Sequence, residues 1–316
     1  MNSDFPEVLA AQPAGICKAA RLLSEGQLVA FPTETVYGLG ADARSDRAVR
    51  AIYAAKGRPA NNPLIVHVAD LDRAREIAFL GAAAEQLARM FWPGALTLVL
   101  PVRPDAGLAA PLMAGLETVA VRVPAHPVAA ELLKVFCGPV AAPSANPSGR
   151  ISPTTAAHVV DGMGGRVAAV LDGGPTEVGL ESTILDLSGP GAVLLREGGI
   201  PRERIEDAVG PLAAATSPTA APKAPGQLAS HYAPKAAVRL NATKASAGEL
   251  LLGFGPVAGD VSLSPIGDLD EAARNLFACL HHLDDLDKPI AVAPIPEDGI
   301  GRAINDRLRR AAAPRD

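Results

Sequence analysis

The chain has 316 residues, of which 48% are hydrophobic and 20% are charged; this balance supports buried cores and excludes disorder over most of the length. Lys and Arg number 29 against 34 Asp and Glu, so the net charge is −5, which argues against a general polyphosphate binder because such proteins gather positive charge. Aromatic residues make up 3%, too few for the base-stacking platforms that hold single-stranded nucleic acid.

The N-terminal stretch MNSDFPEVLA has acidic residues where a secretory signal needs a basic segment and an apolar core. No apolar run in the sequence reaches the roughly 18 residues that a membrane span requires. The cysteines, Cys17, Cys137 and Cys279, are far apart and form no CxxC pair, which is typical of a reducing compartment. We therefore expect a cytoplasmic protein without a membrane segment.

Over the first two hundred residues, apolar runs alternate with helical patterns, which predicts an α/β domain with a mixed sheet. Helices are predicted over 14–24, 46–55, 83–91 and 128–136. Strands are predicted over 27–31, 64–68, 96–100, 119–123, 139–142, 167–171, 183–187 and 192–195. Ser45 or Asp46 is expected to cap the second helix, and Ser152 followed by Pro153 is expected to begin a later one.

The composition changes at residues 211–225, which read PLAAATSPTAAPKAP and have no helical or strand period. Such a segment is typical of a linker, so we predict a large domain over 1–210, a linker over 211–235 and a small domain over 236–316. Two helical patterns, 269–283 and 300–311, flank a buried-strand run at 289–295, which predicts a small Rossmann-like α/β unit. His281 and His282 are interpreted as ordinary surface and core positions of its first helix.

Two polar segments follow predicted elements in the first third of the chain. FPTETVYGLG (31–40) places Thr33, Glu34 and Thr35 at a strand end, where α/β proteins hold ligands; the alternative is a plain turn ended by glycine. KGRPANN (56–62) gathers Lys56, Arg58 and Asn62, a cluster that can neutralise a triphosphate. Its alternative is a helix end, with Gly57 as the left-handed residue and Pro59 as the stop.

Strand alternation in VAVRV (119–123) places the three valines on one face and Ala120 with Arg122 on the other. Arg122 must therefore reach solvent or an anion, because burying it unpaired costs several kcal/mol. His67 lies in a similar strand, LIVHV, and a lone histidine there is more often a core group than a ligand.

The segment APSANPSGRISPT (142–154) runs from a strand through Ser144 and Asn146 toward Ser152. A serine-rich loop before a helix is a natural phosphate or oxyanion site; the alternative is a plain Asn-Pro turn. ESTI and LLREGG add Ser182 and Arg196, and SHYAP adds Tyr232 beyond the linker. The motifs HExxH, GxSxG, GxxxxGK[ST] and GxGxxG do not occur in the sequence.

Together, PTETVYGLG, AKGRPANNPLIVHV, VAVRVP, APSANPSGRISPT, GLESTILDL, LLREGGI and SHYAP resemble the YrdC-like threonylcarbamoyl-AMP synthases, in their long two-domain form. The resemblance implies a YrdC-like twisted mixed sheet with helices, plus a small Rossmann-like C-terminal domain. It implies an L-threonylcarbamoyladenylate synthase, a nucleotidyltransferase that converts L-threonine, bicarbonate or CO2, and ATP, used with Mg²⁺, into threonylcarbamoyl-AMP and pyrophosphate. Separate proteins would then pass the group to tRNA; direct tRNA binding by this chain is left open.

The resemblance also implies roles for individual residues. The residues expected to contact L-threonine are Thr35, His67, Arg122, Ala142 and Ser182. Those expected to contact ATP are Arg58, Asn62, Thr118, Ser144, Ser152, Arg196 and Tyr232. The catalytic group is expected to be Lys56, Arg58, Ser144 and Asn146, and no metal ligand is assigned. Because the chain reaches Tyr232 through the linker, residues 211–235 would form a lid over the site.

Two other functions compete with the synthase. A YrdC-like module without synthase activity could bind RNA, although the acidic net charge weighs against it. Carbamoyl transfer from carbamoyl phosphate is the other, and the related hydrogenase-maturation proteins are larger chains with zinc-binding cysteines that this sequence lacks.

Overall fold

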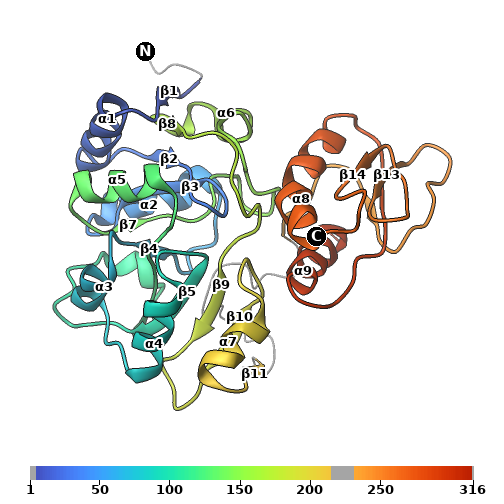
Figure 1. Cartoon of the computed structure of the whole chain (residues 1–316). Helices are drawn as coiled ribbons and strands as arrows, with labels where there is room; N and C mark the ends of the chain where they lie inside the picture. Colours follow the sequence, from blue (N-terminus) through green and yellow to red (C-terminus); the bar gives the residue numbers. More distant parts are fainter. Residues whose placement is uncertain (1–4, 215–230, 315–316) are drawn as a thin grey trace.

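The computed structural model describes residues 5–214 and 231–314, which form a large α/β domain and a smaller one beside it (Figure 1). Most of the predicted linker or lid at 211–235 lies outside the described residues, so these boundaries stay predictions. Within the described chain, no helix combines the length and the apolar character that crossing a membrane requires.

The helices and strands alternate along both domains. The α-helices are α1 (Pro13–Ser24), α2 (Asp46–Lys56), α3 (Leu71–Ile77), α4 (Ala82–Phe91), α5 (Pro127–Phe136), α6 (Ala156–Met163), α7 (Arg202–Val209), α8 (Leu269–Asp284) and α9 (Gly301–Ala312), with short 3₁₀ turns at Ala110–Met113 and Gly164–Arg166. The strands of the large domain are β1 (Glu7–Ala10), β2 (Val29–Phe31), β3 (Gly38–Asp42), β4 (Ile65–His67), β5 (Leu96–Pro101), β6 (Thr118–Arg122), β7 (Val140–Ala141), β8 (Ala169–Asp172), β9 (Thr183–Asp186), β10 (Val193–Arg196) and β11 (Ala213–Ala214). The small domain contains β12 (Val238–Arg239), β13 (Leu250–Gly253), β14 (Val261–Ser262) and β15 (Ile290–Val292).

The large domain is built on a mixed sheet in the order β1-β8-β2-β3-β7-β4-β6-β5-β9-β10-β11. Helices cover both faces. On one face α1 and α5 pack together with Val29 and Phe31 of β2. On the other, α2, α4 and α6 pack with Ala30 of the same strand. Because successive residues of a strand point to opposite faces, β2 contributes to both cores, and the predicted mixed α/β sheet is confirmed.

Helix α2 begins and ends where its sequence indicates. The Ser45 hydroxyl accepts the N–H of Ala48, and Gly57 ends the helix in the left-handed conformation, with φ 62°. Both predictions made for this helix are confirmed. A side chain at position 57 would be strained by that backbone, so the glycine allows the chain to turn sharply toward Arg58.

Strand β6 has the predicted alternation. Val119, Val121 and Val123 join the larger core, whereas Ala120 packs in a small cluster on the opposite face. Arg122 lies at the end of the strand on that second face and is 4% exposed. This alternation directs the one charged residue of the strand toward a buried polar region.

The prediction that Ser152 and Pro153 begin a helix is wrong. Helix α6 begins at Ala156 and is capped by the hydroxyl of Thr155, which accepts the N–H of His158. The Ser152 hydroxyl instead donates to Glu181 Oε1 at 2.6 Å. As a helix cap, the Ser152 hydroxyl would accept a hydrogen bond from a neutral backbone N–H. Its bond to the ionised Glu181 carboxylate is stronger, and residues 151–153 stay outside the helix.

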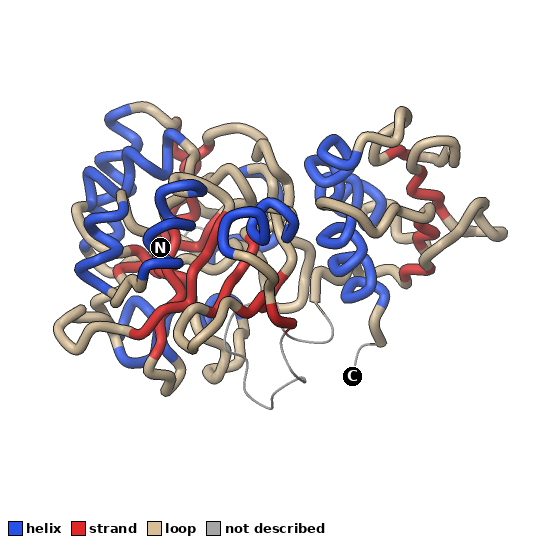
Figure 2. The backbone as a smooth tube through the Cα atoms, turned by 60° about the horizontal axis from the view of Figure 1, so that its bottom comes forward, coloured by secondary structure: helices blue, strands red, loops and turns tan. Residues whose placement is uncertain are grey.

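The small domain is a parallel four-stranded sheet in the order β12-β15-β13-β14. Figures 1 and 2 show α8 and α9 between this sheet and the large domain. Its core extends across the boundary to Val36, Ile151 and Leu180 of the large domain.

His282 is exposed, as expected of a surface position, whereas His281 is half-buried and makes contacts that its sequence did not predict. Its ring stacks on His158 of α6, with centroids 4.0 Å apart, and its Nε2 lies 3.2 Å from the Ser152 carbonyl. His281 therefore belongs to the contact between the two domains.

Candidate active site

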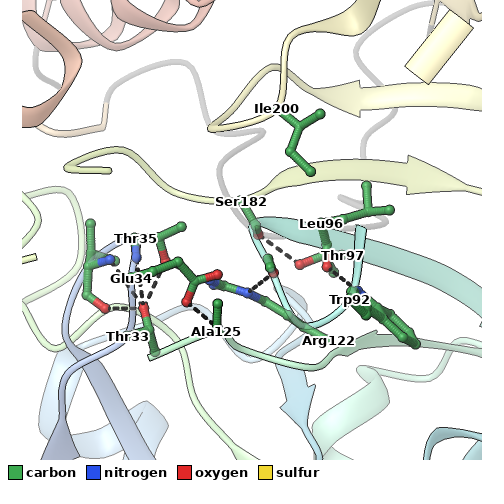
Figure 3. Close-up of polar contacts among 12 residues, drawn as sticks. Thr33, Glu34, Thr35, Trp92, Leu96, Thr97, Arg122, Ala125, Ser182 and Ile200 are labelled. Atoms are coloured by element: carbon green, nitrogen blue, oxygen red, sulfur yellow. Dashed lines mark hydrogen bonds and ion pairs between the residues drawn. The ribbon is translucent and has the colours of Figure 1, made fainter. Parts of the chain in front are cut away.

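Thr33, Glu34 and Thr35 lie in the turn between β2 and β3. The Thr33 hydroxyl donates to the carbonyl of Val36 at 2.6 Å and lies 2.8 Å from the Thr35 hydroxyl. These three side chains are 2%, 5% and 0% exposed. The turn thus holds two hydroxyls and a carboxylate inside the protein (Figure 3).

Arg122 finds its counter-ion in this turn. Its Nη2 donates to Glu34 Oε1 at 2.6 Å and its Nη1 to Thr35 Oγ1 at 2.9 Å (Figure 3). Its Nε donates to the Gly94 carbonyl at 3.2 Å, and Glu34 Oε2 accepts the N–H of Ala125 at 3.1 Å. The expectation that Arg122 needs an anion is confirmed. Within the described chain these bonds use three of its five N–H groups, and the other two can donate to an anionic ligand.

Ser182 is held by two other side chains. Its hydroxyl lies 2.7 Å from the Thr97 hydroxyl (Figure 3) and accepts from Arg196 Nη2 at 3.1 Å. Its carbonyl accepts from the same Nη2 at 2.8 Å. A Cβ on Gly198 would lie 2.4 Å from the Ser182 carbonyl carbon, so the glycine permits the close approach that brings these groups together.

Lys56 ends α2 and is 4% exposed. Its Nζ donates to the Ser144 carbonyl at 2.6 Å and also to the carbonyl of Asn146. Burial, followed by the charges of Arg58 and Arg166, holds the pKa of Lys56 well below its usual range. The side chain thus joins the end of α2 to the loop that follows β7.

Arg58 is oriented by the segment just after it. Its Nη2 donates to Asn62 Oδ1 at 2.6 Å and to the Pro63 carbonyl at 2.9 Å. Burial lowers its pKa to about 10, so the guanidinium is still charged at neutral pH. The same stretch is therefore both the end of a helix and a cationic cluster, as each interpretation of the sequence suggested.

Several buried polar atoms at this place have no hydrogen-bond partner among the described residues. They are Nδ2 of Asn62, Nδ1 of His67, Oδ1 of Asn146 and Nδ1 of His231. Burial lowers the pKa of both histidines to about 3, so both are neutral at pH 7. Because buried polar groups are almost always hydrogen-bonded, this concentration of unpaired atoms indicates a place for a polar ligand.

These side chains surround one cavity of about 40 Å³. The lining residues are Thr33, Thr35, Val36, Gly38, Arg58, Ile65, His67, Arg122, Ala142, Pro143, Ser144, Glu181, Ser182, Arg196, His231 and Tyr232. Most of the predicted site residues are among them. Glu181 and His231 were not predicted as site residues; their positions beside Ser182 and Tyr232 in the sequence were the available signal.

Five predicted residues do not line the cavity. Lys56, Asn62 and Ser152 lie one contact behind it, bonded respectively to the lining residues Ser144, Arg58 and Glu181. The carbonyl of Asn146 accepts from the Lys56 ammonium, one contact further away. Thr118 is at the opposite end of β6 from Arg122, roughly 13 Å away along the strand, where it pairs with Pro101. The structure does not bring Thr118 to the site, and its predicted contact with ATP stays a prediction.

The residues present do not form a site for a resident metal ion. Among the residues that the structure describes, no three His, Cys, Asp or Glu side chains gather closely enough to hold one. The two buried carboxylates at the site, Glu34 and Glu181, are ion-paired with Arg122 and Arg307.

Comparisons with known proteins agree along the whole chain. A family model described as "Telomere recombination" matches residues 21–198, and one described as "Threonylcarbamoyl-AMP synthase, C-terminal domain" matches residues 200–313. A threonylcarbamoyl-AMP synthase of Bacillus subtilis is 41% identical and covers 99% of this chain and 97% of its own. One of Pyrococcus abyssi is 42% identical and covers 93% of each chain.

Solved structures match in the same way. The crystal structure of Pyrococcus abyssi Sua5 complexed with L-threonine has a TM-score of 0.89 and 39% identity, and covers 96% of this chain and 97% of that chain. The structure of E. coli YciO, with a TM-score of 0.56 and 23% identity, covers 63% of this chain and 96% of that chain; it shows the fold of the large domain alone.

Proposed function

The chain belongs to the threonylcarbamoyl-AMP synthase family, and on this premise we propose that it joins L-threonine, bicarbonate or CO2, and ATP into threonylcarbamoyl-AMP, with release of pyrophosphate. The observation that supports this most strongly is the shared cavity, on which the buried cations Arg58, Arg122 and Arg196 converge. The substrates carry a carboxylate and a triphosphate, and buried guanidinium groups are well suited to both. The reaction makes the chain a nucleotidyltransferase, because AMP is transferred to the carbamate.

L-Threonine occupies the end of the cavity near the β2–β3 turn. Its carboxylate accepts the two N–H groups of Arg122 that Glu34, Thr35 and Gly94 do not use. Its amine and hydroxyl lie among the other residues assigned to it, which are Thr35, His67, Ala142 and Ser182. His67, held neutral by burial, can donate or accept one hydrogen bond there without adding charge.

ATP occupies the end of the cavity lined by Arg58, Ser144, Arg196 and Tyr232. Asn62 orients Arg58 through its side-chain oxygen, and Lys56 holds the Ser144–Asn146 loop through its carbonyls. Ser152 acts from behind, through Glu181. Mg²⁺ comes bound to the ATP phosphates and offsets their charge.

The chemistry needs no covalent intermediate on the enzyme. The threonine amine adds to CO2, or to bicarbonate with loss of water, to give a carbamate. A carbamate oxygen then attacks the α-phosphorus of ATP, and the bond to the pyrophosphate oxygen breaks. The protein's part is to align these groups, to stabilise the charge that develops on the phosphates and to exclude water from the unstable carbamate.

ATP is far larger than the cavity of about 40 Å³, which is room for a few water molecules. His231 and Tyr232, which lie within the predicted linker or lid at 211–235, line its wall. We therefore propose that the cavity widens when the nucleotide enters, and the lid over 211–235 stays a prediction. The transfer of the threonylcarbamoyl group to tRNA by other proteins, and the cytoplasmic location, stay predictions.

The alternative of an RNA-binding module is less well supported. Lys56, Arg58, Arg122 and Arg196 are each at most 8% exposed, and a phosphate backbone cannot reach cations that are buried in a small cavity. The synthase uses the same cations for small ligands that enter the site.

Pyrophosphate release with Mg-ATP, bicarbonate and L-threonine tests the proposal, measured for the full mixture and with each component omitted in turn. We expect release to fall at least about tenfold without threonine, because the carbamate is the nucleophile. Serine and valine serve as matched controls, since each lacks one group of the threonine side chain. Release at the same rate without any amino acid would contradict the proposed function.

A further inference from the structure

Arg307 is a fully buried charge that belongs to the small domain but lies against the site. It is on α9 and is 0% exposed. Its Nε donates to Glu181 Oε2 at 2.8 Å, its Nη2 to the Glu197 carbonyl at 2.9 Å, and its Nη1 to Asp306 at 2.7 Å. Two of these three acceptors are in the large domain, so the side chain joins the two domains through its charge.

Glu181 is the carboxylate that Arg307 neutralises, and it lines the cavity. Its other oxygen accepts the Ser152 hydroxyl at 2.6 Å. Burial alone would raise the pKa of Glu181, but the charges of Arg307 and then Arg196, with the hydrogen bonds from Ser152 and Arg307, hold it below its usual range. Glu181 is therefore an anion that is ion-paired with Arg307 and also stabilised by the charge of Arg196.

Arg196 is the other arginine, and it is one of the cations proposed to bind ATP. With Arg307 in place, Glu181 is ion-paired from the side of the small domain. Without Arg307, Glu181 would have Arg196 as its nearest cation, and the carboxylate would compete with the nucleotide phosphates for that guanidinium. Removing one member of a buried ion pair generally has this cost, because the other charge is left without its partner.

Arg307 also supports Tyr232. The guanidinium carbon lies 5.1 Å from the centre of the Tyr232 ring, and the Phe277 ring stacks on the same tyrosine with centroids 5.6 Å apart. Tyr232 has φ 62°, in the left-handed region that bulky residues rarely adopt. A strained backbone of this kind is kept only when surrounding contacts fix it, and Arg307 provides one of them.

We propose that Arg307 is a positioning residue for ATP, which acts by neutralising Glu181, so that Arg196 stays directed to the nucleotide, and by supporting the Tyr232 ring. This inference rests on the proposed function, since it concerns the nucleotide end of the same cavity. It assigns a catalytic contribution to the small domain that goes beyond holding the end of the linker.

Four proteins test it: the full-length parent chain, Arg307→Met, Arg307→Lys, and the double variant Arg307→Met with Glu181→Gln. Arg309→Met is the matched control, because Arg309 is on the same helix and pairs with Glu297 on the surface, where both side chains are 56% exposed. Threonine-dependent pyrophosphate release is measured over a range of ATP and of threonine concentrations, and thermal unfolding reports on folding.

For Arg307→Met we expect the KM for ATP to rise at least about tenfold while the KM for threonine stays within about twofold. Arg307→Lys, which keeps the charge but not the planar fork, is expected to raise the KM for ATP by about threefold. The double variant should recover part of the ATP affinity lost in Arg307→Met, because it no longer contains an unpaired carboxylate. Arg309→Met should behave like the parent chain.

An unchanged KM for ATP in Arg307→Met would overturn the inference. So would a double variant that binds ATP more weakly than Arg307→Met, since a merely structural role predicts further loss. If Arg307→Met does not fold, an unchanged KM for ATP in Arg307→Lys overturns it instead. A parent chain that releases no threonine-dependent pyrophosphate would contradict the proposed function, an outcome distinct from each of these.

Discussion

Each buried arginine proposed to bind substrate has an acceptor of its own within the chain. Arg58 donates to Asn62, Arg122 to Glu34, and Arg196 to Ser182. These bonds orient the guanidinium groups before any ligand arrives, so that little reorganisation is needed when charge develops during the reaction. They also offset the large cost of holding charges away from water.

His67 gives a prediction for the dependence of stability on pH. Burial, followed by the charge of Arg122, lowers its pKa from 6.5 to about 3. Between these values the unfolded chain binds a proton that the folded chain does not, so stability is present above pH 6.5 and is lost as the pH falls. Urea unfolding should show that this group makes the free energy of unfolding about 2 kcal/mol lower at pH 5 than at pH 7.

The variant His67→Gln should lack that part of the pH dependence, and its free energy of unfolding should fall less between the two pH values. His282→Gln is the matched control, because His282 is exposed on α8. Equal pH dependence in the parent chain and in His67→Gln would show that His67 does not titrate as its burial indicates.

At the scale of the elements, the site is made from the ends of neighbouring strands. His67 ends β4 and Arg122 ends β6, and the parallel register of these strands pairs the two residues directly. Arg196 ends β10, and Ser182 comes immediately before β9. Because strand ends meet at one edge of a sheet, residues more than a hundred positions apart reach the same cavity.

The contact between the domains depends on a glycine. Gly179 has φ 75°, and a Cβ there would lie 2.5 Å from the backbone of Arg274 on α8. Gly174 has φ 80° in the same loop, but nothing would lie within 4 Å of its Cβ. Gly174→Ala should therefore lower the free energy of unfolding by the backbone strain alone, about 1 kcal/mol. Gly179→Ala should lower it by about 2 kcal/mol more, because α8 must move.

Urea unfolding of the two variants measures this difference, and pyrophosphate release shows whether moving α8 disturbs the site. We expect the activity of Gly174→Ala to match that of the parent chain and that of Gly179→Ala to decrease. Equal stability of the two variants would mean that the domains are not packed as closely at this point as the backbone contact indicates.

Local features of this fold could be predicted from the sequence. Helix α2, with its Ser45 cap and its Gly57 end, depends on residues close to one another in the chain, as does the alternation of β6. Strand β3 was missed because GLGAD has few strand-forming side chains, and it forms by pairing with β2 and β7. Strand β1 and helices α3 and α7 were also missed.

The roles that could not be predicted depend on partners far away in the sequence. Ser152 has a helix-cap pattern but bonds to Glu181, and His281 has the pattern of an ordinary helix position but stacks on His158. Nothing in α9 indicates that Arg307 would reach the site. Most of the residues that line the cavity could be predicted from the motifs, because those segments contain polar side chains that neither a hydrophobic core nor a turn requires.

At the scale of the whole molecule, the contact between the two domains completes the wall of the cavity. Tyr232 lines the cavity and packs in the core of the small domain together with Val36 and Leu180 of the large domain.

Identification of the product tests the proposed synthase activity most directly. The protein is incubated with L-threonine, Mg-ATP and ¹³C-labelled bicarbonate, and the mixture is analysed at once by mass spectrometry because the carbamate is unstable. We expect an adduct that contains AMP, threonine and the labelled carbon, and its amount should increase together with the amount of pyrophosphate released. AMP and pyrophosphate without that adduct, or an adduct whose carbon is unlabelled, would contradict the proposal.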